Sequence, residues 1–173
     1  MIALITGGSG CGKSVYAERL MDRLAAGERR YYIATMQVCD EESRLRVLRH
    51  RAQRAGRGYE TLECPLDLRG TAVAEGACAL LECLPNLVAN EMFGAGDVGR
   101  VFPAIKALSR RCKHLIVVTN DVFSDGEPYT PEVQAYMQAL AQLNARTAAL
   151  ADCAVEVVYS IPVPVKGALP CFG

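Results

Sequence analysis

The strongest constraint on the fold is a glycine-rich segment that follows the first six residues. Residues 7–14 read Gly-Gly-Ser-Gly-Cys-Gly-Lys-Ser and fit the phosphate-binding loop pattern G-x-x-x-x-G-K-[ST]. An apolar, β-prone run (2–6) precedes this loop, and a run that is compatible with a helix (13–26) follows it. The order strand, loop, helix predicts a site for the phosphates of a nucleoside triphosphate, with the positive end of the helix directed at them.

Each residue type in the loop suits this role. The glycines let the backbone turn tightly and direct successive N–H groups at the phosphates. Lys13 is expected to reach the β- and γ-phosphates, and the Ser14 hydroxyl is expected to ligate Mg²⁺. The alternative is a glycine-rich turn that binds nothing. The predicted nucleotide contacts in this segment are Gly7, Gly8, Ser9, Gly10, Cys11, Gly12, Lys13 and Ser14.

Length and charge narrow the class of protein. The chain has 173 residues, of which 51% are hydrophobic, and this predicts a single domain over residues 1–173. Nineteen basic and nineteen acidic side chains leave no net charge, so we expect neither a nucleic-acid partner nor attraction to an anionic membrane. The eight cysteines are scattered without a C-x-x-C pair, which is typical of reduced thiols in a cytoplasmic protein. The apolar stretch 77–89 is interrupted and too short to cross a bilayer, so no membrane insertion is expected.

Short apolar runs alternate with longer amphipathic ones along the chain. This alternation predicts an α/β fold of the P-loop NTPase type, with a mostly parallel sheet and helices on both faces. Thr130, Pro131 and Glu132 supply an N-cap, a proline at the first helical position and an early acid for the last helix. The tail 162–173 contains three prolines and is expected to be extended or frayed. The expected strands are 2–6, 30–35, 59–62, 77–82, 114–119 and 154–159, and the expected helices are 13–26, 41–54, 84–93, 99–111 and 131–150.

Ligands of an open parallel sheet gather at the carboxyl ends of its strands. This rule selects the phosphate-binding loop, residues 35–37, Glu82 with Cys83, and residues 119–121.

The same positions hold motifs in a recognisable order, and the chain from residue 1 to about 166 resembles the bifunctional adenosylcobinamide kinase/adenosylcobinamide-phosphate guanylyltransferase family. The resemblance is carried by Thr6, Gly7 and Gly8; Tyr32, Ile33, Ala34, Thr35 and Gln37; Asp40, Glu42, Arg46, His50 and Arg51; Leu80, Leu81, Glu82, Cys83 and Asn90; Val118, Thr119 and Asn120; and Asn144, Ala151 and Asp152.

The resemblance implies two reactions. ATP or GTP phosphorylates the aminopropanol hydroxyl of adenosylcobinamide, and GTP then donates GMP to that phosphate through a GMP-histidine intermediate. His50 matches the guanylylated histidine, with Lys13 as the other implied catalytic residue. The implied ligands are GTP, ATP, Mg²⁺, adenosylcobinamide and its phosphate, and the implied assembly is a homo-oligomer such as a trimer, for which the apolar stretch 84–93 offers a surface. The resemblance further implies nucleotide contacts by Thr35, Arg51, Arg54, Glu63 and Glu82, and a metal contact by Glu82 besides Ser14.

The residues around His50 suit such a role. On a helix, Arg46 and Arg54 lie four residues to either side of it and on the same face. Neighbouring positive charge lowers the pKa of an imidazole and keeps the ring neutral and nucleophilic near pH 7. The alternative is a solvated basic helix face with an incidental histidine.

The other candidates also have structural alternatives. Glu82 ends a buried strand and would need a partner there, so it is either a ligand contact or a paired structural acid. Glu63 is either a nucleotide contact or an exposed acid at a strand end. His114 opens an apolar strand without a companion for metal or acid–base work, and we expect it to be structural.

The chain departs from the family pattern in its carboxyl-terminal half. Asp121, Val122 and Phe123 replace Glu-Val-Gly; Tyr136, Met137 and Gln138 replace Phe-Arg-Asp; Ala141 and Ser160 replace glycines. The altered segments 121–127 and 136–141 leave two other functions open. One is a P-loop kinase for another small alcohol without guanylyl transfer, and the other is a non-catalytic nucleotide-binding module.

Overall fold

The computed structural model describes residues 1–37, 41, 44–45, 47–48, 56–121 and 129–168. Their strands form one sheet in the order β3-β2-β4-β5-β1-β6-β7. All neighbouring strands are parallel except β7, which runs antiparallel to β6. The mostly parallel α/β fold expected from the alternating sequence is therefore confirmed. The strands are β1 (Ile2–Thr6), β2 (Arg30–Ala34), β3 (Tyr59–Glu63), β4 (Cys78–Leu81), β5 (His114–Val118), β6 (Cys153–Val158) and β7 (Ile161–Lys166).

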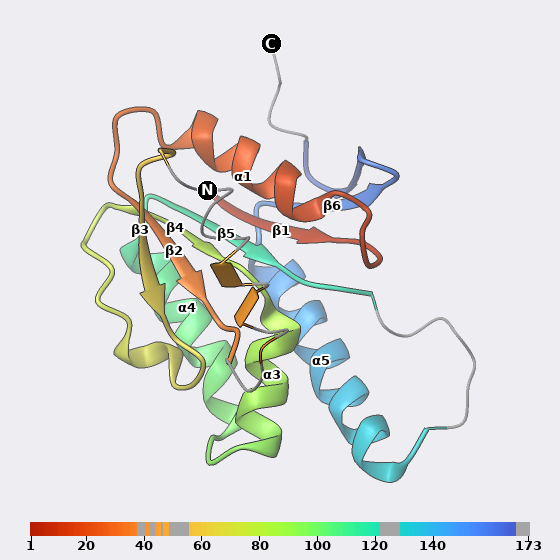
Figure 1. The fold of residues 1–173 in the computed structure, drawn as a ribbon. Helices are drawn as coiled ribbons and strands as arrows, with labels where there is room; N and C mark the ends of the chain where they lie inside the picture. The colour runs from red at the N-terminus through yellow and green to blue at the C-terminus, as the bar shows by residue number, and fades with distance from the viewer. Residues whose placement is uncertain (38–40, 42–43, 46, 49–55, 122–128, 169–173) are drawn as a thin grey trace.

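Helices cover both faces of the sheet (Figure 1). Helix α1 (Lys13–Leu24) lies on one face, and α3 (Leu84–Phe93), α4 (Val101–Arg111) and α5 (Pro131–Leu150) lie on the other. Two short 3₁₀ helices, η1 (Leu68–Gly70) and η2 (Val98–Arg100), were not expected from the sequence. Helix α5 begins as predicted, because the Thr130 hydroxyl accepts a hydrogen bond from the Val133 N–H and Pro131 follows the cap.

Successive residues of each strand point to opposite faces of the sheet, so each central strand contributes side chains to the hydrophobic core on both faces. In β1, Leu4 packs with buried residues of α3, α4 and α5, while Ala3 and Ile5 pack with α1. The central strands are buried on both faces, which accounts for their continuous apolar sequence. Burial on both sides fixes the register, because a slip of one residue would exchange the two faces. The sheet is therefore a rigid support for the loops at its carboxyl edge.

The chain after Pro162 was expected to be extended or frayed, and up to Lys166 it is extended. Residues up to Lys166 form the ordered edge strand β7, in which Pro162 and Pro164 pair with Val157 and Val155. Proline is tolerated at a sheet edge, where a missing N–H need not interrupt the ladder. The Lys166 ammonium donates to the carbonyl oxygens of Ala148, Ala149 and Ala151 and so caps the carboxyl end of α5.

Two further expectations concerned the helix at 41–54 and an exposed apolar surface at 84–93. Most of the predicted helix 41–54 lies outside the described residues, although Glu41, Arg44, Leu45, Val47 and Leu48 are helical. The stretch 84–93 does form a helix, but its apolar side chains do not offer the expected surface: Leu84, Leu87 and Val88 are buried within the chain's own core, and Phe93 is exposed. Among the described residues, no helix is long and apolar enough to span a bilayer.

Candidate phosphate-binding site

The loop between β1 and α1 has the backbone that its sequence predicts. Gly10 and Gly12 have φ angles of 71° and 93°, which favour glycine, and Gly12 is the N-cap of α1. Gly8, Ser9 and Gly10 are exposed, and so is Ser14 in the first turn of the helix. The Lys13 ammonium folds back and donates to the carbonyl oxygen of Gly8 across 2.9 Å. The loop is thus an open cradle at a helix N-terminus, the arrangement that binds phosphate.

The turn between β6 and β7 forms a wall beside this loop. The Ser160 N–H donates to the Cys11 carbonyl oxygen across 2.8 Å. A Cβ on Gly7 would lie 2.5 Å from the Val157 carbonyl oxygen, and one on Gly12 would lie 2.6 Å from the Ser160 hydroxyl oxygen. A side chain at Gly7 would therefore collide with the backbone of β6, and one at Gly12 would have to displace the Ser160 hydroxyl. Sequence reasoning missed this wall, since an extended or frayed tail after Pro162 was not expected to pair with β6.

Glu82 follows β4, which is separated from β1 by β5 alone. Its backbone N–H donates to the Ile33 carbonyl oxygen across 3.1 Å. Burial raises the pKa of the neighbouring Cys83 thiol to about 11; the Glu82 charge acts in the same direction and the Lys13 charge opposes it. Glu82 and the loop lysine therefore both lie near Cys83, at the carboxyl edge of the sheet.

Thr35 is completely buried at the end of β2. Its hydroxyl donates to the Cys83 carbonyl oxygen across 3.0 Å. The Asn90 side-chain amide donates to the carbonyl oxygens of Thr35, at 2.8 Å, and of Pro65, at 2.9 Å. The Thr35 hydroxyl thus holds the segment that carries Glu82, and the Asn90 amide links the residues that follow β2 and β3.

A second polar group lies at the end of β5, directly beside β1. The buried Thr119 hydroxyl donates to Asn144 Oδ1 across 2.7 Å, and Asn144 Nδ2 donates to the Asn120 carbonyl oxygen across 3.3 Å. The side-chain oxygen of Asn120 is buried without a hydrogen-bond partner among the described residues. An unpaired polar atom at this edge is expected where a ligand completes the hydrogen bonding.

The remaining sequence candidates lie elsewhere. Glu63 ends β3, four strand spacings or about 19 Å from β1, and lines a separate hollow of about 440 Å³. His114 lies at the opposite edge of the sheet, where its Nδ1 is 3.3 Å from the amino-terminal nitrogen of Met1. The positions of His50, Arg51 and Arg54, and all of the altered segment 121–127 except Asp121, lie outside the described residues. In the segment 136–141, the Tyr136 hydroxyl contacts the Pro85 carbonyl oxygen at 3.3 Å.

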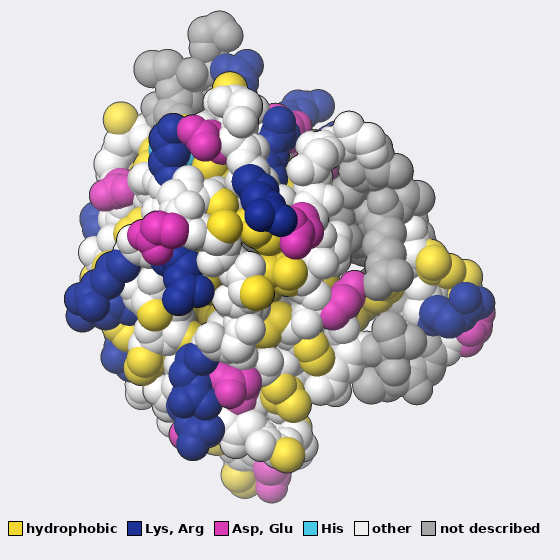
Figure 2. All heavy atoms as spheres, turned by 90° about the vertical axis from the view of Figure 1, so that its left-hand side faces the viewer, with side chains coloured by type: hydrophobic (Ala, Val, Ile, Leu, Met, Phe, Trp, Pro, Cys, Tyr) yellow, Lys and Arg dark blue, Asp and Glu magenta, His cyan; other side chains and the backbone are white. Residues whose placement is uncertain are grey.

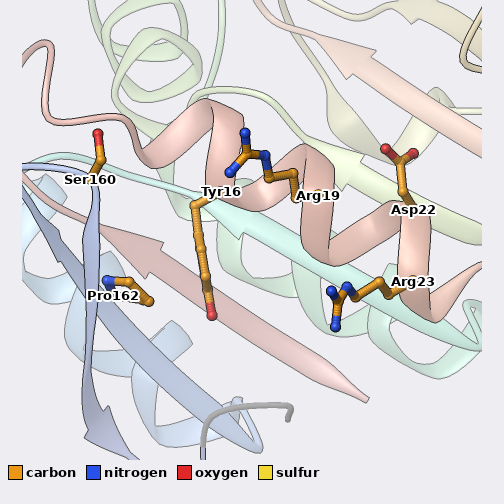
Figure 3. A pocket seen from close by; sticks show the side chains of 6 residues that line it. All are labelled: Tyr16, Arg19, Asp22, Arg23, Ser160 and Pro162. Carbon is orange, nitrogen blue, oxygen red and sulfur yellow. The ribbon is translucent and has the colours of Figure 1, made fainter. Parts of the chain in front are cut away.

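Hollows lie on either side of the β6–β7 hairpin. The first, of about 550 Å³, is lined by Tyr16, Arg19, Asp22 and Arg23 of α1 and by Ser160 and Pro162 of the hairpin (Figure 3). The second, of about 580 Å³, lies between residues 8–11 of the phosphate-binding loop and residues 156–160. On the face shown in Figure 2, described basic and acidic side chains are interspersed rather than gathered into one field.

The donor atoms of the site determine which metal ion it could hold. Among the described residues, no group of three or more His, Cys, Asp and Glu side chains could hold a metal ion. Mg²⁺ is usually bound by one or two protein oxygens together with substrate phosphates and water. The exposed Ser14 hydroxyl and the Glu82 carboxylate are oxygen donors of the required kind.

Comparison with known proteins gives a consistent result. Residues 3–165 match the model of the family described as cobinamide kinase / cobinamide phosphate guanyltransferase. The bifunctional adenosylcobalamin biosynthesis protein CobU of Salmonella typhimurium is 32% identical, over 96% of this chain and 100% of the relative. The protein of the same name from Escherichia coli K12 is 27% identical with the same coverage.

Solved structures extend the likeness to the fold. The flagellar accessory protein FlaH of Methanocaldococcus jannaschii has a TM-score of 0.57 at 13% identity, covering 96% of this chain and 78% of that one. A second solved structure, an ATPase domain, has a TM-score of 0.50 at 8% identity, covering 90% of this chain and 68% of that one. These neighbours share the P-loop NTPase architecture, and at such low identity the likeness concerns the fold alone.

Proposed function

The chain belongs to the cobinamide kinase / cobinamide phosphate guanyltransferase family, and from this premise we propose that it phosphorylates adenosylcobinamide and then converts the phosphate to adenosylcobinamide-GDP. The observation that carries the proposal is the open, glycine-built loop at the N-terminus of α1, with Lys13 in the first turn of that helix and Glu82 at the end of β4, two strands from β1. The chain covers the whole length of its curated relatives, which are named as bifunctional.

In the kinase step, the loop binds the triphosphate through backbone N–H groups, and Lys13 exchanges the Gly8 carbonyl oxygen for phosphate oxygens. The substrate hydroxyl oxygen attacks the γ-phosphorus, the bond from that phosphorus to the β-bridging oxygen breaks, and the nucleoside diphosphate leaves, while the hydroxyl proton passes to solvent. Lys13 stabilises the charge that shifts toward the leaving oxygen. The proposed donors are GTP and ATP.

Ser14 and Glu82 would hold Mg²⁺ together with the phosphates. When bound, the ion neutralises phosphate charge and orients the oxygens for in-line displacement. Thr35 has a supporting role in this proposal, since its hydroxyl fixes the Cys83 backbone next to Glu82. Glu63 lies far along the sheet edge from the loop, and we assign it to the GTP that is bound for guanylyl transfer.

In the guanylyl-transfer step, an imidazole nitrogen of His50 attacks the α-phosphorus of GTP and pyrophosphate leaves. The phosphate of adenosylcobinamide phosphate then attacks the same phosphorus, the phosphorus–nitrogen bond breaks, and the imidazole is regenerated. Arg51 and Arg54 are proposed to contact the nucleotide phosphates. The support for this step is the match of these residues to the family pattern and the positive charge of their neighbours in sequence.

We extend the proposal to the setting of the reaction. A single domain over residues 1–173 carries both activities, in the cytoplasm, without a nucleic-acid partner. A homo-oligomer such as a trimer would cover exposed apolar side chains, among which the edge strand β7 contributes Ile161, Val163 and Val165.

The covalent step is tested by incubating the full chain with Mg²⁺ and GTP labelled at the α-phosphate, without acceptor. We expect labelled protein, stable in alkali and lost in acid, as a phosphorus–nitrogen bond requires. His50→Ala should abolish the label, and the matched variant His114→Ala should retain it, because His114 lies at the opposite edge of the sheet. An unlabelled wild-type chain under conditions where GTP binds would reject guanylyl transfer and leave the kinase step alone.

A further inference from the structure

We propose that the hollow between the phosphate-binding loop and the β6–β7 hairpin holds the base of the triphosphate bound for phosphoryl transfer, with Tyr159 stacked on the base and Glu156 selecting guanine. This inference rests on the proposed triphosphate site and adds a base-recognition site to it. The hollow has a volume of about 580 Å³, within the range of small-molecule pockets.

The position of the hollow connects it to the phosphates. Residues 8–11 form one wall, and the same residues belong to the cradle that would hold the triphosphate. The opposite wall, residues 156–160, is fixed to the loop by the hydrogen bond from the Ser160 N–H to the Cys11 carbonyl oxygen. A nucleotide with its phosphates in the loop therefore has this space beside it, and the walls keep their distance without the ligand.

Tyr159 stands at the tip of the hairpin with 90% of its surface exposed. Its φ angle is 49° and that of Ser160 is 65°, the pattern of a two-residue turn that favours Asn-Gly. A bulky aromatic residue is disfavoured in this left-handed region, and such strain concentrates at ligand sites. Neither turn propensity nor burial explains the tyrosine, whereas stacking on a nucleobase does, because every base offers an aromatic face.

Among the described residues, Glu156 is the one carboxylate that lines the hollow. It is half-buried in β6, and its carboxylate makes no hydrogen bond or ion pair with another described side chain. A carboxylate repels phosphate, so it disfavours a second phosphate site here. It accepts hydrogen bonds from the N1–H and amino group of guanine, while adenine presents the lone pair of its N1 to the same position. The charge and the stacking surface together fit a guanine base.

The experiment measures binding of GTP, ATP and inorganic tripolyphosphate to the full chain by calorimetry. Tripolyphosphate reports on the loop alone, because it has no base. Tyr159→Asn removes the ring while it keeps a residue that tolerates the turn, and we expect GTP affinity to fall about tenfold with tripolyphosphate affinity unchanged. Tyr159→Phe keeps the ring and should bind GTP as the wild type does.

A separate variant tests whether Glu156 selects guanine over adenine. Glu156→Gln should lower the preference for GTP over ATP about tenfold, since a charge-assisted hydrogen bond is lost. The matched control Glu75→Gln removes an exposed carboxylate just before β4, at the other edge of the sheet, and should leave the preference unchanged.

The outcomes separate this inference from the function on which it rests. If GTP affinity is unchanged in Tyr159→Asn while Lys13→Ala weakens the binding of both GTP and tripolyphosphate, the base site is overturned and the triphosphate site stands. If the molecular mass in solution falls in Tyr159→Asn and GTP affinity does not, the hairpin is a contact between copies of the chain and the inference is overturned. If the wild type binds neither GTP nor tripolyphosphate, the proposed function fails as well.

Discussion

The Ser160 hydroxyl oxygen occupies the space beside Gly12, so that a Cβ on Gly12 would lie only 2.6 Å from it. The two residues are far apart in the sequence and belong to different structural units, the β6–β7 turn and the N-cap of α1. Contact between them means that the hairpin, as well as the phosphate, restricts the last glycine of the loop. The effect of a substitution at Gly12 on stability should consequently depend on which residue occupies position 160.

We predict that Gly12→Ala lowers the free energy of unfolding by about 2 kcal/mol, because alanine is strained at φ 93° and its Cβ meets Ser160. Gly8→Ala is the matched control: no atom lies within 4 Å of its added Cβ, and the change should be within about 0.5 kcal/mol. Adding Ser160→Gly to Gly12→Ala should restore part of the loss. Urea denaturation checks all of these values, and a strictly additive double variant would contradict the coupling.

Lys13→Ala should weaken binding of GTP and of tripolyphosphate alike, by about 10- to 100-fold, because charge-assisted hydrogen bonds to phosphate are lost. Stability should change little, since the lysine makes one exposed hydrogen bond to Gly8. Lys106→Ala, on the exposed side of α4, is the control of equal charge change. Equal affinities for all three proteins in calorimetry would place the triphosphate outside the loop.

Asn90 links the residues that follow β2 and β3, Thr35 and Pro65, through their carbonyl oxygens. Asn90→Ala leaves the carbonyl oxygens of Thr35 and Pro65 without their donor and should cost about 1–3 kcal/mol in the free energy of unfolding. Asn90→Asp should cost more at pH 7, because a carboxylate faces the two oxygens, and less as the pH falls and the carboxyl group protonates. Denaturation of both variants at pH 7 and pH 5 checks the order, and a pH-independent Asp variant would refute it.

His114 gives a prediction on pH. Burial lowers the pKa of its imidazole, and the amino-terminal charge and Lys113 act in the same direction. The unfolded chain therefore binds this proton more readily than the folded chain, so the free energy of unfolding falls as the pH drops through about 6.5. His114→Gln should lose less stability than the wild type between pH 7.5 and pH 5.5. Parallel stability curves for the two proteins would show that His114 does not contribute.

Much of the fold was predictable because strands that are buried on both faces have continuous apolar sequences. The continuous apolar run 114–119 indicated a central strand, and Thr130 with Pro131 marked the start of α5 correctly. The hairpin was missed, since Tyr159 and Ser160 are not the usual residues of a two-residue turn and the prolines suggested an extended or frayed tail. The strand β7 is held by its pairing with β6 and by the contact of Lys166 with the end of α5, and no local sequence pattern indicates the second of these.

The candidate site, like the fold, could be predicted only where a local sequence pattern specifies it. Gly7 to Ser14 could be found from a local motif, because their function depends on consecutive backbone groups. The distance of Glu63 from the loop depends on strand order, which the sequence does not state directly. The same holds for the burial of Thr35 and for the wall formed by residues 156–160, where contact joins segments that are distant in the chain.

The most direct test of the account follows the product by mass spectrometry after incubation of adenosylcobinamide with GTP, Mg²⁺ and the full chain. The account predicts adenosylcobinamide-GDP from the wild type, adenosylcobinamide phosphate alone from His50→Ala, and neither product from Lys13→Ala. If the wild type yields neither product while GTP is shown to bind, or if His50→Ala still forms adenosylcobinamide-GDP, the proposed sequence of phosphoryl and guanylyl transfer is contradicted.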